Sequence, residues 1–253
     1  MHKVMVLNAK GGCGKTTIAT SLACYFACHG YNTAIMDFDP QGSSNRWLQI
    51  RSPELPSIKS IDAVRAKTGV TRSWQLYGGG ETEIVIMDTP AGLTGTKLMD
   101  LFHKADTILV PVMPSVIDLH AIEGFLGELG RLFKQGRSGK RLGVVANRVR
   151  LKTKAFHAIE QLIAEAGMPL VASLRDTQNY SIAMESGLGI CELNDRVSSR
   201  DRDHWRPILD WLQQAIPQKP QVVPDYPRLE RTASNTDPQQ RELSFSDARL
   251  AAS

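Results

Sequence analysis

Apolar residues along the chain occur in short runs, separated by longer stretches in which they recur at helical spacing. Strands buried on both faces of a parallel sheet are typically apolar at consecutive positions. Such runs occur at residues 3–8, 33–37, 84–88, 107–112 and 142–146, with a weaker one at 170–174. Helical spacing predicts helices at 15–29, 115–135, 154–166, 177–185 and 201–215. The alternation predicts an α/β fold with a doubly wound, mostly parallel sheet, which binds ligands at the carboxyl ends of its strands.

Two segments depart from this alternation. Residues 51–82 carry two prolines and the turn Gly78-Gly79-Gly80, so we expect a partly irregular surface segment there. From residue 217 onward, prolines punctuate a polar stretch that reaches Ser253. We therefore divide the chain into a domain at 1–216 and a Pro-rich tail at 217–253, which is extended or disordered or serves as a partner-binding arm.

Composition narrows the class of protein only slightly. The 253 residues are 42% hydrophobic and 22% charged, as in ordinary globular proteins, and the formal net charge is +4. The four cysteines form no C-x-x-C pair, which favours a reducing cytoplasmic location over a disulfide scaffold. No apolar run reaches the roughly 18 residues that a membrane-spanning helix needs, so no membrane association is expected.

The strongest chemical signal directly follows the first predicted strand and opens the first predicted helix. It reads Lys10-Gly11-Gly12-Cys13-Gly14-Lys15-Thr16-Thr17. Glycines allow backbone N–H groups to surround a phosphate, and a helix N-terminus adds its own donors. Lys15 is predicted to reach the β- and γ-phosphates of a nucleotide, and the Thr16 hydroxyl to bind Mg²⁺. The usual phosphate-loop pattern begins with glycine where Ala9 stands, and this departure accompanies the extra Lys10.

Carboxylates at the ends of two other predicted strands complete this site. Asp37 ends the second strand and Asp39 follows two residues later, while Asp88 ends the third. Asp37 and Asp88 are predicted to help hold Mg²⁺, as a carboxylate at a strand end does in many nucleotide hydrolases. Thr89 stands where many such hydrolases carry a second acid, so we expect slow basal hydrolysis with Asp39 orienting the attacking water.

Basic charge is concentrated in one part of the chain. Nine lysines and arginines and no acid occur from Arg131 to Ile159. Arg150, Lys152 and Lys154 alternate in an expected loop and would point to one side, and a second basic cluster includes Arg200 and Arg202. These five residues are predicted to bind the phosphate backbone of double-stranded DNA without reading its sequence, although a merely solvated surface is the alternative.

The motifs resemble the ParA/MinD family of P-loop NTPases with a deviant Walker A loop. The resemblance covers roughly residues 1–215 and rests on residues 10–17, the DFDPQG stretch from Asp37, and the DTPAG stretch from Asp88. The DPQG residues within this stretch resemble the ParA branch of the family rather than the MinD branch. The resemblance implies that Asn147 and Arg148 contact the adenine, and that two chains enclose ATP and Mg²⁺, with Lys10 reaching the partner subunit's phosphates.

The resemblance also implies a function. ParA-type ATPases bind nucleoid DNA non-specifically as ATP-bound homodimers, and a ParB-like or cargo-adaptor protein releases them by stimulating hydrolysis. The implied cargo is a plasmid, a chromosome or a protein microcompartment such as the carboxysome. Three alternatives stay open: a MinD-like membrane-positioning ATPase anchored by the tail residues Leu243, Phe245 and Leu250, a metabolic P-loop synthetase, and an iron–sulfur carrier.

Overall fold

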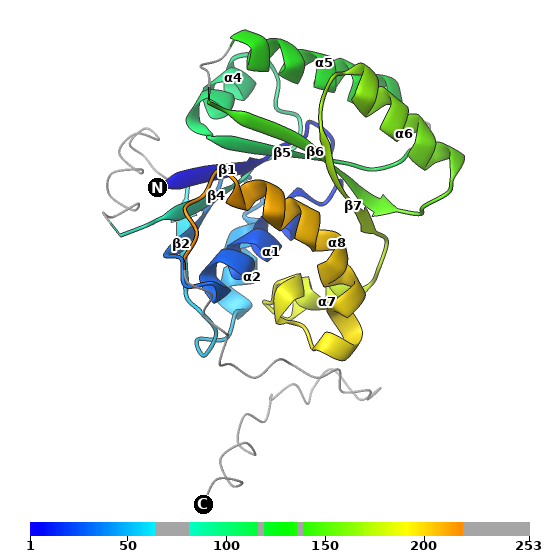
Figure 1. The fold of residues 1–253 in the computed structure, drawn as a ribbon. Coiled ribbons are helices and arrows are strands. Elements are labelled where there is room, and N and C mark those ends of the chain that lie inside the picture. The colour runs from blue at the N-terminus through cyan, green and yellow to red at the C-terminus, as the bar shows by residue number, and fades with distance from the viewer. Residues whose placement is uncertain (64–80, 116–118, 136–138, 220–253) are drawn as a thin grey trace, which may run out of the picture.

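In the described part of the chain, seven parallel strands form one sheet at the centre of the molecule (Figure 1). The computed structural model describes residues 1–63, 81–115, 119–135 and 139–219. The strands lie in the order β3-β2-β4-β1-β5-β6-β7. Their bounds are β1 (His2–Val6), β2 (Thr33–Asp37), β3 (Ile58–Asp62), β4 (Ile84–Asp88), β5 (Thr107–Val112), β6 (Arg141–Val149) and β7 (Leu170–Arg175). The predicted α/β class and parallel sheet are confirmed.

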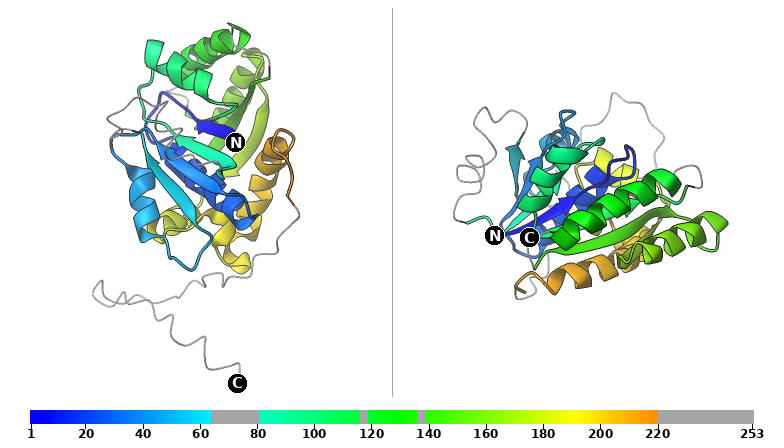
Figure 2. Two further views of the ribbon diagram at one scale, coloured as in Figure 1. Left: turned by 90° about the vertical axis from the view of Figure 1, so that its left-hand side faces the viewer. Right: turned by 90° about the horizontal axis from the view of Figure 1, so that it is seen from above.

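Helices cover both faces of this sheet, as a doubly wound fold requires (Figure 2). One face carries α1 (Lys15–Cys28), α2 (Ser43–Ile50), α7 (Asn179–Glu185), the short 3₁₀ helix η2 (Ile190–Glu192) and α8 (Asp195–Gln213). The other face carries α4 (Gly95–Lys104), α5 (Leu119–Gln135) and α6 (Lys154–Glu165). Because the strands run in parallel, the loops that follow them gather at one edge of the sheet.

The strand pleat sorts the apolar side chains of the sheet into two cores. Val4 and Val6 pack with α1 and α8, whereas Met5 and Leu7 pack with the core beneath α4 and α5. All four are fully buried. Consecutive apolar residues are therefore needed in the central strands, which is the pattern from which those strands were predicted.

Four elements of the described residues were not predicted from the sequence: β3, α2, α4 and the short helix η2. The prediction of a partly irregular segment at 51–82 was wrong for residues 58–62, which form the edge strand β3. Helices α2 and α4 were also missed, although Trp47 of α2 and Leu98 of α4 are buried. The turn at Gly78–Gly80 lies outside the described residues.

Several element boundaries also differ from the sequence analysis. In the described residues α5 begins at Leu119, and α8 begins at Asp195, earlier than the expected residue 201. Asn194 caps α8 by accepting a hydrogen bond from the Arg196 N–H over 2.9 Å, which explains the earlier start. None of the described helices is long and apolar enough to cross a membrane.

The first residues of the predicted tail are held against the domain. The hydroxyl of Tyr31 donates to the carbonyl of Pro217 over 2.8 Å, and the Lys219 N–H donates to that hydroxyl over 3.1 Å. The Lys219 ammonium also pairs with Glu83. The rest of the predicted tail, residues 220–253, lies outside the described residues.

Candidate nucleotide-binding site

The loop between β1 and α1 has the backbone that an anion-binding loop needs. Gly12 and Gly14 have φ angles of +73° and +91°, which side chains larger than glycine rarely adopt. A Cβ atom on Gly14 would also lie 2.2 Å from the Nδ2 atom of Asn147. No side chain caps the N-terminus of α1, and its first turn contains no acid, so its N–H groups and positive dipole end are available to a phosphate.

Lys15 occupies the first turn of α1 and is only 7% exposed. Its Nζ atom donates to the main-chain carbonyl of Lys10 over 2.9 Å. The ammonium is thus held inside the loop, where a phosphate group would enter. Thr16 and Thr17, the residues assigned to Mg²⁺ and phosphate, follow it at the start of the helix and are half-buried.

Asp37 and Asp88 lie side by side at the carboxyl edge of the sheet. They are paired in the register of β2 and β4, and Asp88 also pairs with Val6, the last residue of β1. Both carboxylates are fully buried. Asp37 accepts hydrogen bonds from the N–H groups of Asp39, over 2.9 Å, and Asn45, over 3.2 Å. The fold therefore brings together the two acids that the sequence assigned to one cation.

Asp88 has no hydrogen-bond partner for either carboxylate oxygen among the described residues. Burial raises its pKa to about 7, and the negative charges of Asp37 and Asp39 add to this effect. The nearby Thr16 hydroxyl acts in the opposite direction and lowers the pKa of Asp88, although the two groups do not meet the geometry of a hydrogen bond. A buried carboxylate that lacks donors is suited to a cation, because a bound Mg²⁺ would supply the missing charge.

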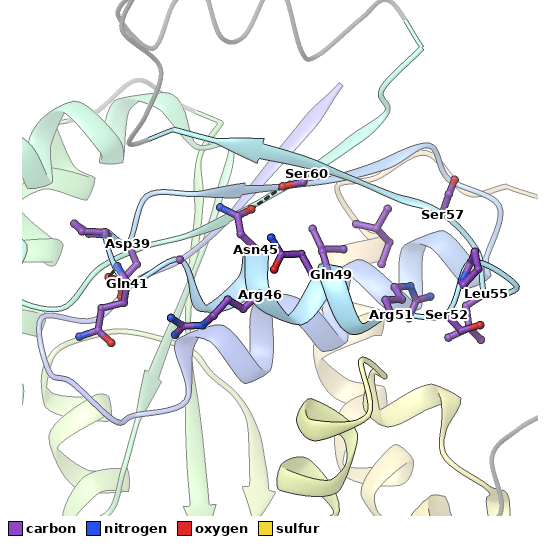
Figure 3. Close-up of a pocket in the computed structure, with 15 residues that line it drawn as sticks. Asp39, Gln41, Asn45, Arg46, Gln49, Arg51, Ser52, Leu55, Ser57 and Ser60 are labelled. Carbon is purple, nitrogen blue, oxygen red and sulfur yellow. Dashed lines mark hydrogen bonds between the residues drawn. The ribbon is translucent and has the colours of Figure 1, made fainter. Parts of the chain in front are cut away.

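Asp39 lies outside this buried pair, in the loop between β2 and α2. Its carboxylate accepts from the N–H of Gln41 over 2.9 Å. It also borders a cavity of about 720 Å³ that lies between α2 and β3 (Figure 3). No residue of the 10–17 loop lines this cavity, so we do not assign the nucleotide to it.

A smaller cavity of about 370 Å³ opens beside the loop instead. Its wall includes Gly12 and Gly14 of the loop, Asn147 and Arg148 at the end of β6, and Asp176 after β7. Asn147 is buried and donates to the carbonyl of Cys13 over 2.9 Å. The structure thus places both residues assigned to adenine in one wall of a cavity that adjoins the phosphate loop.

Arg148 and Arg150 share a single carboxylate. The Nε atom of Arg148 lies 3.1 Å from Asp176, and a guanidinium nitrogen of Arg150 lies 3.8 Å from the same side chain. Arg148 and Lys152 have positive φ angles of 54° and 64°, the only described residues other than glycine with this backbone. Asp176 therefore connects the cavity wall with the basic residues that follow β6.

The basic segment of the sequence is divided between the two ends of β6. Lys140 donates to the carbonyls of Phe102, over 3.1 Å, and Ala105, and Arg141 stacks on Trp211 with its guanidinium carbon 4.4 Å from the ring centre. These two cations stabilise the fold at the start of β6. Arg150, Lys152 and Lys154 are exposed at its other end.

The second basic cluster lies close to that exposed end. Val149 of β6 pairs with Arg175 of β7, and Arg175 forms an ion pair with Asp201 of α8. Arg200, the neighbour of Asp201, is exposed. Arg202 is instead half-buried in an ion pair with Asp195. Four of the five residues assigned to DNA are therefore exposed near one end of β6 and β7.

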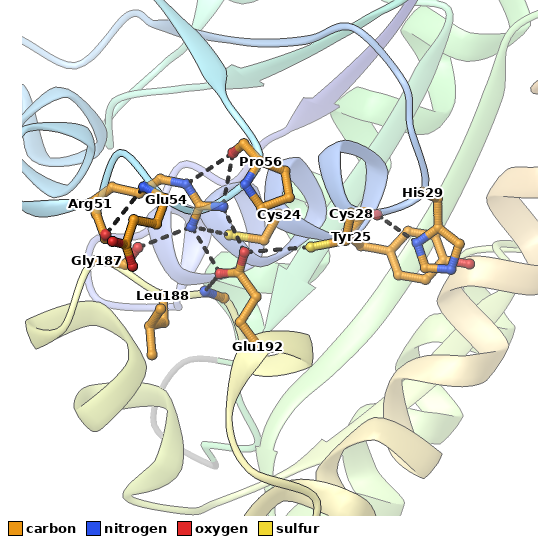
Figure 4. A network of polar contacts seen from close by, with 12 residues as sticks. Cys24, Tyr25, Cys28, His29, Arg51, Glu54, Pro56, Gly187, Leu188 and Glu192 are labelled. Atoms are coloured by element: carbon orange, nitrogen blue, oxygen red, sulfur yellow. Dashed lines mark hydrogen bonds and ion pairs between the residues drawn. The ribbon is translucent and has the colours of Figure 1, made fainter. Parts of the chain in front are cut away.

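A buried ion pair anchors the far end of α2 (Figure 4). The Arg51 guanidinium donates to both Glu192 oxygens, over 2.8 and 2.6 Å, and also to the carbonyl of Gly187 over 3.1 Å. Burial would raise the pKa of Glu192, but the hydrogen bonds from Arg51 lower it below its usual value. Cys24 and Cys28 touch this pair, yet in the described residues no three His, Cys, Asp or Glu side chains are arranged to hold a metal.

Asn8 is a site residue that the sequence analysis missed. It lies two residues after the end of β1, is 4% exposed, and accepts a hydrogen bond from the N–H of Lys10 over 2.9 Å. The available signal was a polar residue at the end of an apolar run, two positions before the lysine. Its second partner, the carbonyl of Pro111, is 103 residues away in the sequence and could not be inferred from spacing.

The parallel sheet, the glycine loop before α1 and the paired acids together define a P-loop nucleotide-binding protein. The model of the CobQ/CobB/MinD/ParA nucleotide-binding domain matches residues 4–190. The chain belongs to this family.

Individual relatives are consistent with the family match. Maintenance of carboxysome distribution protein A of Halothiobacillus neapolitanus is 28% identical over 195 residues, which are 77% of this chain and 88% of that protein. The chromosome-partitioning ATPase Soj of Thermus thermophilus is 26% identical over 157 residues, 51% of this chain and 61% of that protein. The Cyanothece McdA–ATP complex shares the fold, with a TM-score of 0.64 at 18% identity over 88% of this chain and 98% of that chain.

Proposed function

We propose that the protein is a ParA-type ATPase that dimerises on ATP, binds nucleoid DNA non-specifically and positions or segregates a cargo. The observation that carries this proposal is the joining of Lys10, Lys15 and the buried acids Asp37 and Asp88 at one edge of the sheet. Within this family, a loop lysine that precedes the glycines is the feature that the resemblance connects with a nucleotide-enclosing dimer.

The described residues fit ATP and Mg²⁺. Gly11, Gly12, Cys13 and Gly14 would surround the phosphates with N–H groups, and the Lys15 ammonium, held at the Lys10 carbonyl, would donate to them. The hydroxyl of Thr16 and the carboxylates of Asp37 and Asp88 would hold Mg²⁺, which neutralises charge on the phosphate oxygens when bound. Asn147 and Arg148 would contact the base in the adjoining cavity.

Hydrolysis by the isolated protein is expected to be slow. The hydroxyl of Thr89 donates to the carbonyl of Val6 over 2.8 Å, so the residue after Asp88 serves the fold and carries no acid. Asp39 is the remaining candidate for orienting water, and its carboxylate is engaged with Gln41. A partner that moves the Asp39 loop would therefore accelerate the reaction, which is the role expected of a ParB-like or cargo-adaptor protein.

The exposed residues Arg150, Lys152, Lys154 and Arg200 support the DNA surface, with Arg202 beside them. A dimer would double these charges, and phosphate contacts accumulate in affinity, so binding is expected only in the ATP-bound dimer. Relatives are named for carboxysome distribution and for chromosome partitioning. These names support a protein that moves cargo along nucleoid DNA, and therefore a cytoplasmic, nucleoid-associated location. The residues assigned to the alternative membrane anchor lie outside the described part of the chain.

A gel shift with non-specific double-stranded DNA tests this proposal, with ATP, ADP or no nucleotide. We expect a shift with ATP alone, and none for Lys15→Ala. Arg150→Glu combined with Lys152→Glu should abolish the shift without changing ATP affinity. Arg131→Glu with Lys134→Glu is the matched control, because both residues belong to the same basic segment but lie on α5. DNA binding that ignores the nucleotide, or equal loss in both double variants, contradicts the proposal.

A further inference from the structure

The Asn8 side chain connects β5 to the main chain of Lys10. Its Nδ2 group donates to the carbonyl of Pro111 over 2.6 Å, and its Oδ1 atom accepts from the Lys10 N–H over 2.9 Å. The residue is 4% exposed and its bond to Pro111 is buried, so water has little access to the amide. A buried amide with both ends satisfied has one stable orientation, and it transmits that orientation to the group it binds.

The carbonyl of Lys10 is held by different partners. It accepts from the Lys15 ammonium over 2.9 Å and from the Cys13 thiol over 3.3 Å. The preceding carbonyl, of Ala9, accepts from the Gly92 N–H over 2.7 Å. The two polar groups of the Lys10 main chain are therefore fixed from opposite sides, the N–H by Asn8 and the carbonyl by Lys15 and Cys13.

The two supports differ in their relation to a nucleotide. The Lys15 ammonium has three N–H donors, so it would divide them between the Lys10 carbonyl and the β- and γ-phosphates of a bound nucleotide. The bond from the Lys10 N–H to Asn8 does not involve the phosphate site and remains. Asn8 is therefore the side chain that fixes the Lys10 main chain without using a group that contacts phosphate.

We propose that Asn8 is a positioning residue for Lys10, which sets the lysine for contact with the nucleotide of a second subunit. This inference rests on the proposed function, in which Lys10 acts across an ATP-bound dimer. A positioning role predicts that Asn8 matters for dimerisation more than for nucleotide binding by one subunit. A residue that only supports the fold would affect both equally.

The test compares two equilibria in the full chain carrying Asn8→Ala. Sedimentation with a non-hydrolysable ATP analogue gives the dimer Kd, and titration of a fluorescent ADP at low protein concentration gives the affinity of the single subunit. We expect the dimer Kd to rise about tenfold, the effect of losing one ordering hydrogen bond, while ADP affinity stays within about threefold of wild type. In a Lys10→Ala background, Asn8→Ala should weaken dimerisation no further.

Two further variants make the outcome decisive. Thr33→Val removes one buried hydrogen bond, from the Thr33 hydroxyl to the Tyr31 carbonyl, at the opposite edge of the sheet, and should leave the dimer unchanged. Asn8→Asp keeps the size and the acceptor but cannot donate to Pro111, and replaces Asn8→Ala if that variant does not fold. A parallel loss of ADP affinity and dimerisation, or no effect on the dimer, overturns the inference. A Lys10→Ala protein that dimerises like wild type contradicts the proposed function itself.

Discussion

Burial of Asp88 suits this residue to a cation, but it lowers the stability of the metal-free protein. Its pKa rises from 3.8 to about 7 on burial. Between roughly pH 4 and 7 the folded chain therefore keeps a proton that the unfolded chain releases, so stability falls as the pH rises through this window. The acid that would hold Mg²⁺ destabilises the metal-free protein at neutral pH.

Replacing this acid by its neutral analogue should reverse the effect. In metal-free buffer, Asp88→Asn should lose that pH dependence and exceed wild-type stability at pH 8 by up to about 4 kcal/mol. Urea unfolding at pH 5 to 8 with a chelator measures the difference, and Asp100→Asn, at an exposed position on α4, serves as control. A variant no more stable than wild type at pH 8 would show that burial of Asp88 carries no such cost.

Alanine substitutions at Gly14 and Gly167 can distinguish the effect of backbone strain from the effect of a specific side-chain contact. Both have positive φ angles, but a Cβ atom on Gly167 meets nothing within 4 Å, whereas one on Gly14 meets Asn147. We expect Gly167→Ala to lower stability by about 1 kcal/mol and leave nucleotide affinity unchanged. Gly14→Ala should lower ADP affinity at least tenfold, since it displaces Asn147 from the loop. Thermal melting and ADP titration distinguish the two, and equal ADP affinities would contradict the assignment.

At the scale of elements, Asp176 beside the end of β6 connects the residues proposed to contact the nucleotide with those proposed to contact DNA. This carboxylate offsets part of the charge of Arg148 and Arg150, although such exposed ion pairs contribute little to stability. We expect Asp176→Asn to strengthen DNA binding a few-fold at saturating ATP and to steepen the salt dependence by about one charge. Glu165→Gln, at the exposed end of α6, is the matched control. Weaker DNA binding by Asp176→Asn would exclude Arg150 from the DNA surface.

The sequence predicts best the elements that are buried on both faces. The central strands are continuous apolar runs because helices cover both sides of them, whereas β3 is an edge strand with Lys59 and Ser60 exposed. The phosphate loop is local, so its chemistry could be read from spacing. The contact of Asn147 with Cys13 spans 134 residues, and only the fold brings those two residues together. Helix α2 buries little beyond Trp47 and Ser44, which left no clear helical period to detect.

For the molecule as a whole, the parallel sheet places the nucleotide loop, the paired acids and the end of β6 at one edge. We therefore expect a single domain that binds nucleotide without the predicted tail. Chains ending at Lys219 and at Ile216 should therefore both bind ADP like the full chain. The shorter one should lose about 1 kcal/mol of stability, because it lacks the contacts of Pro217 and Lys219 with Tyr31. Urea unfolding and ADP titration check both statements, and loss of ADP binding by the longer chain would place part of the nucleotide site in residues 220–253.

The contacts of Glu83 indicate where a label or a surface tether can be attached to the protein. Its carbonyl accepts from the His2 N–H over 2.7 Å, and its carboxylate pairs with Lys219. The two ends of the described fold thus meet beside the start of β4, about 16 Å of strand away from the phosphate loop. A fluorophore or surface tether placed at the N-terminal residues, or at Lys219 of a chain that ends there, would leave the nucleotide edge and the proposed DNA surface facing solution.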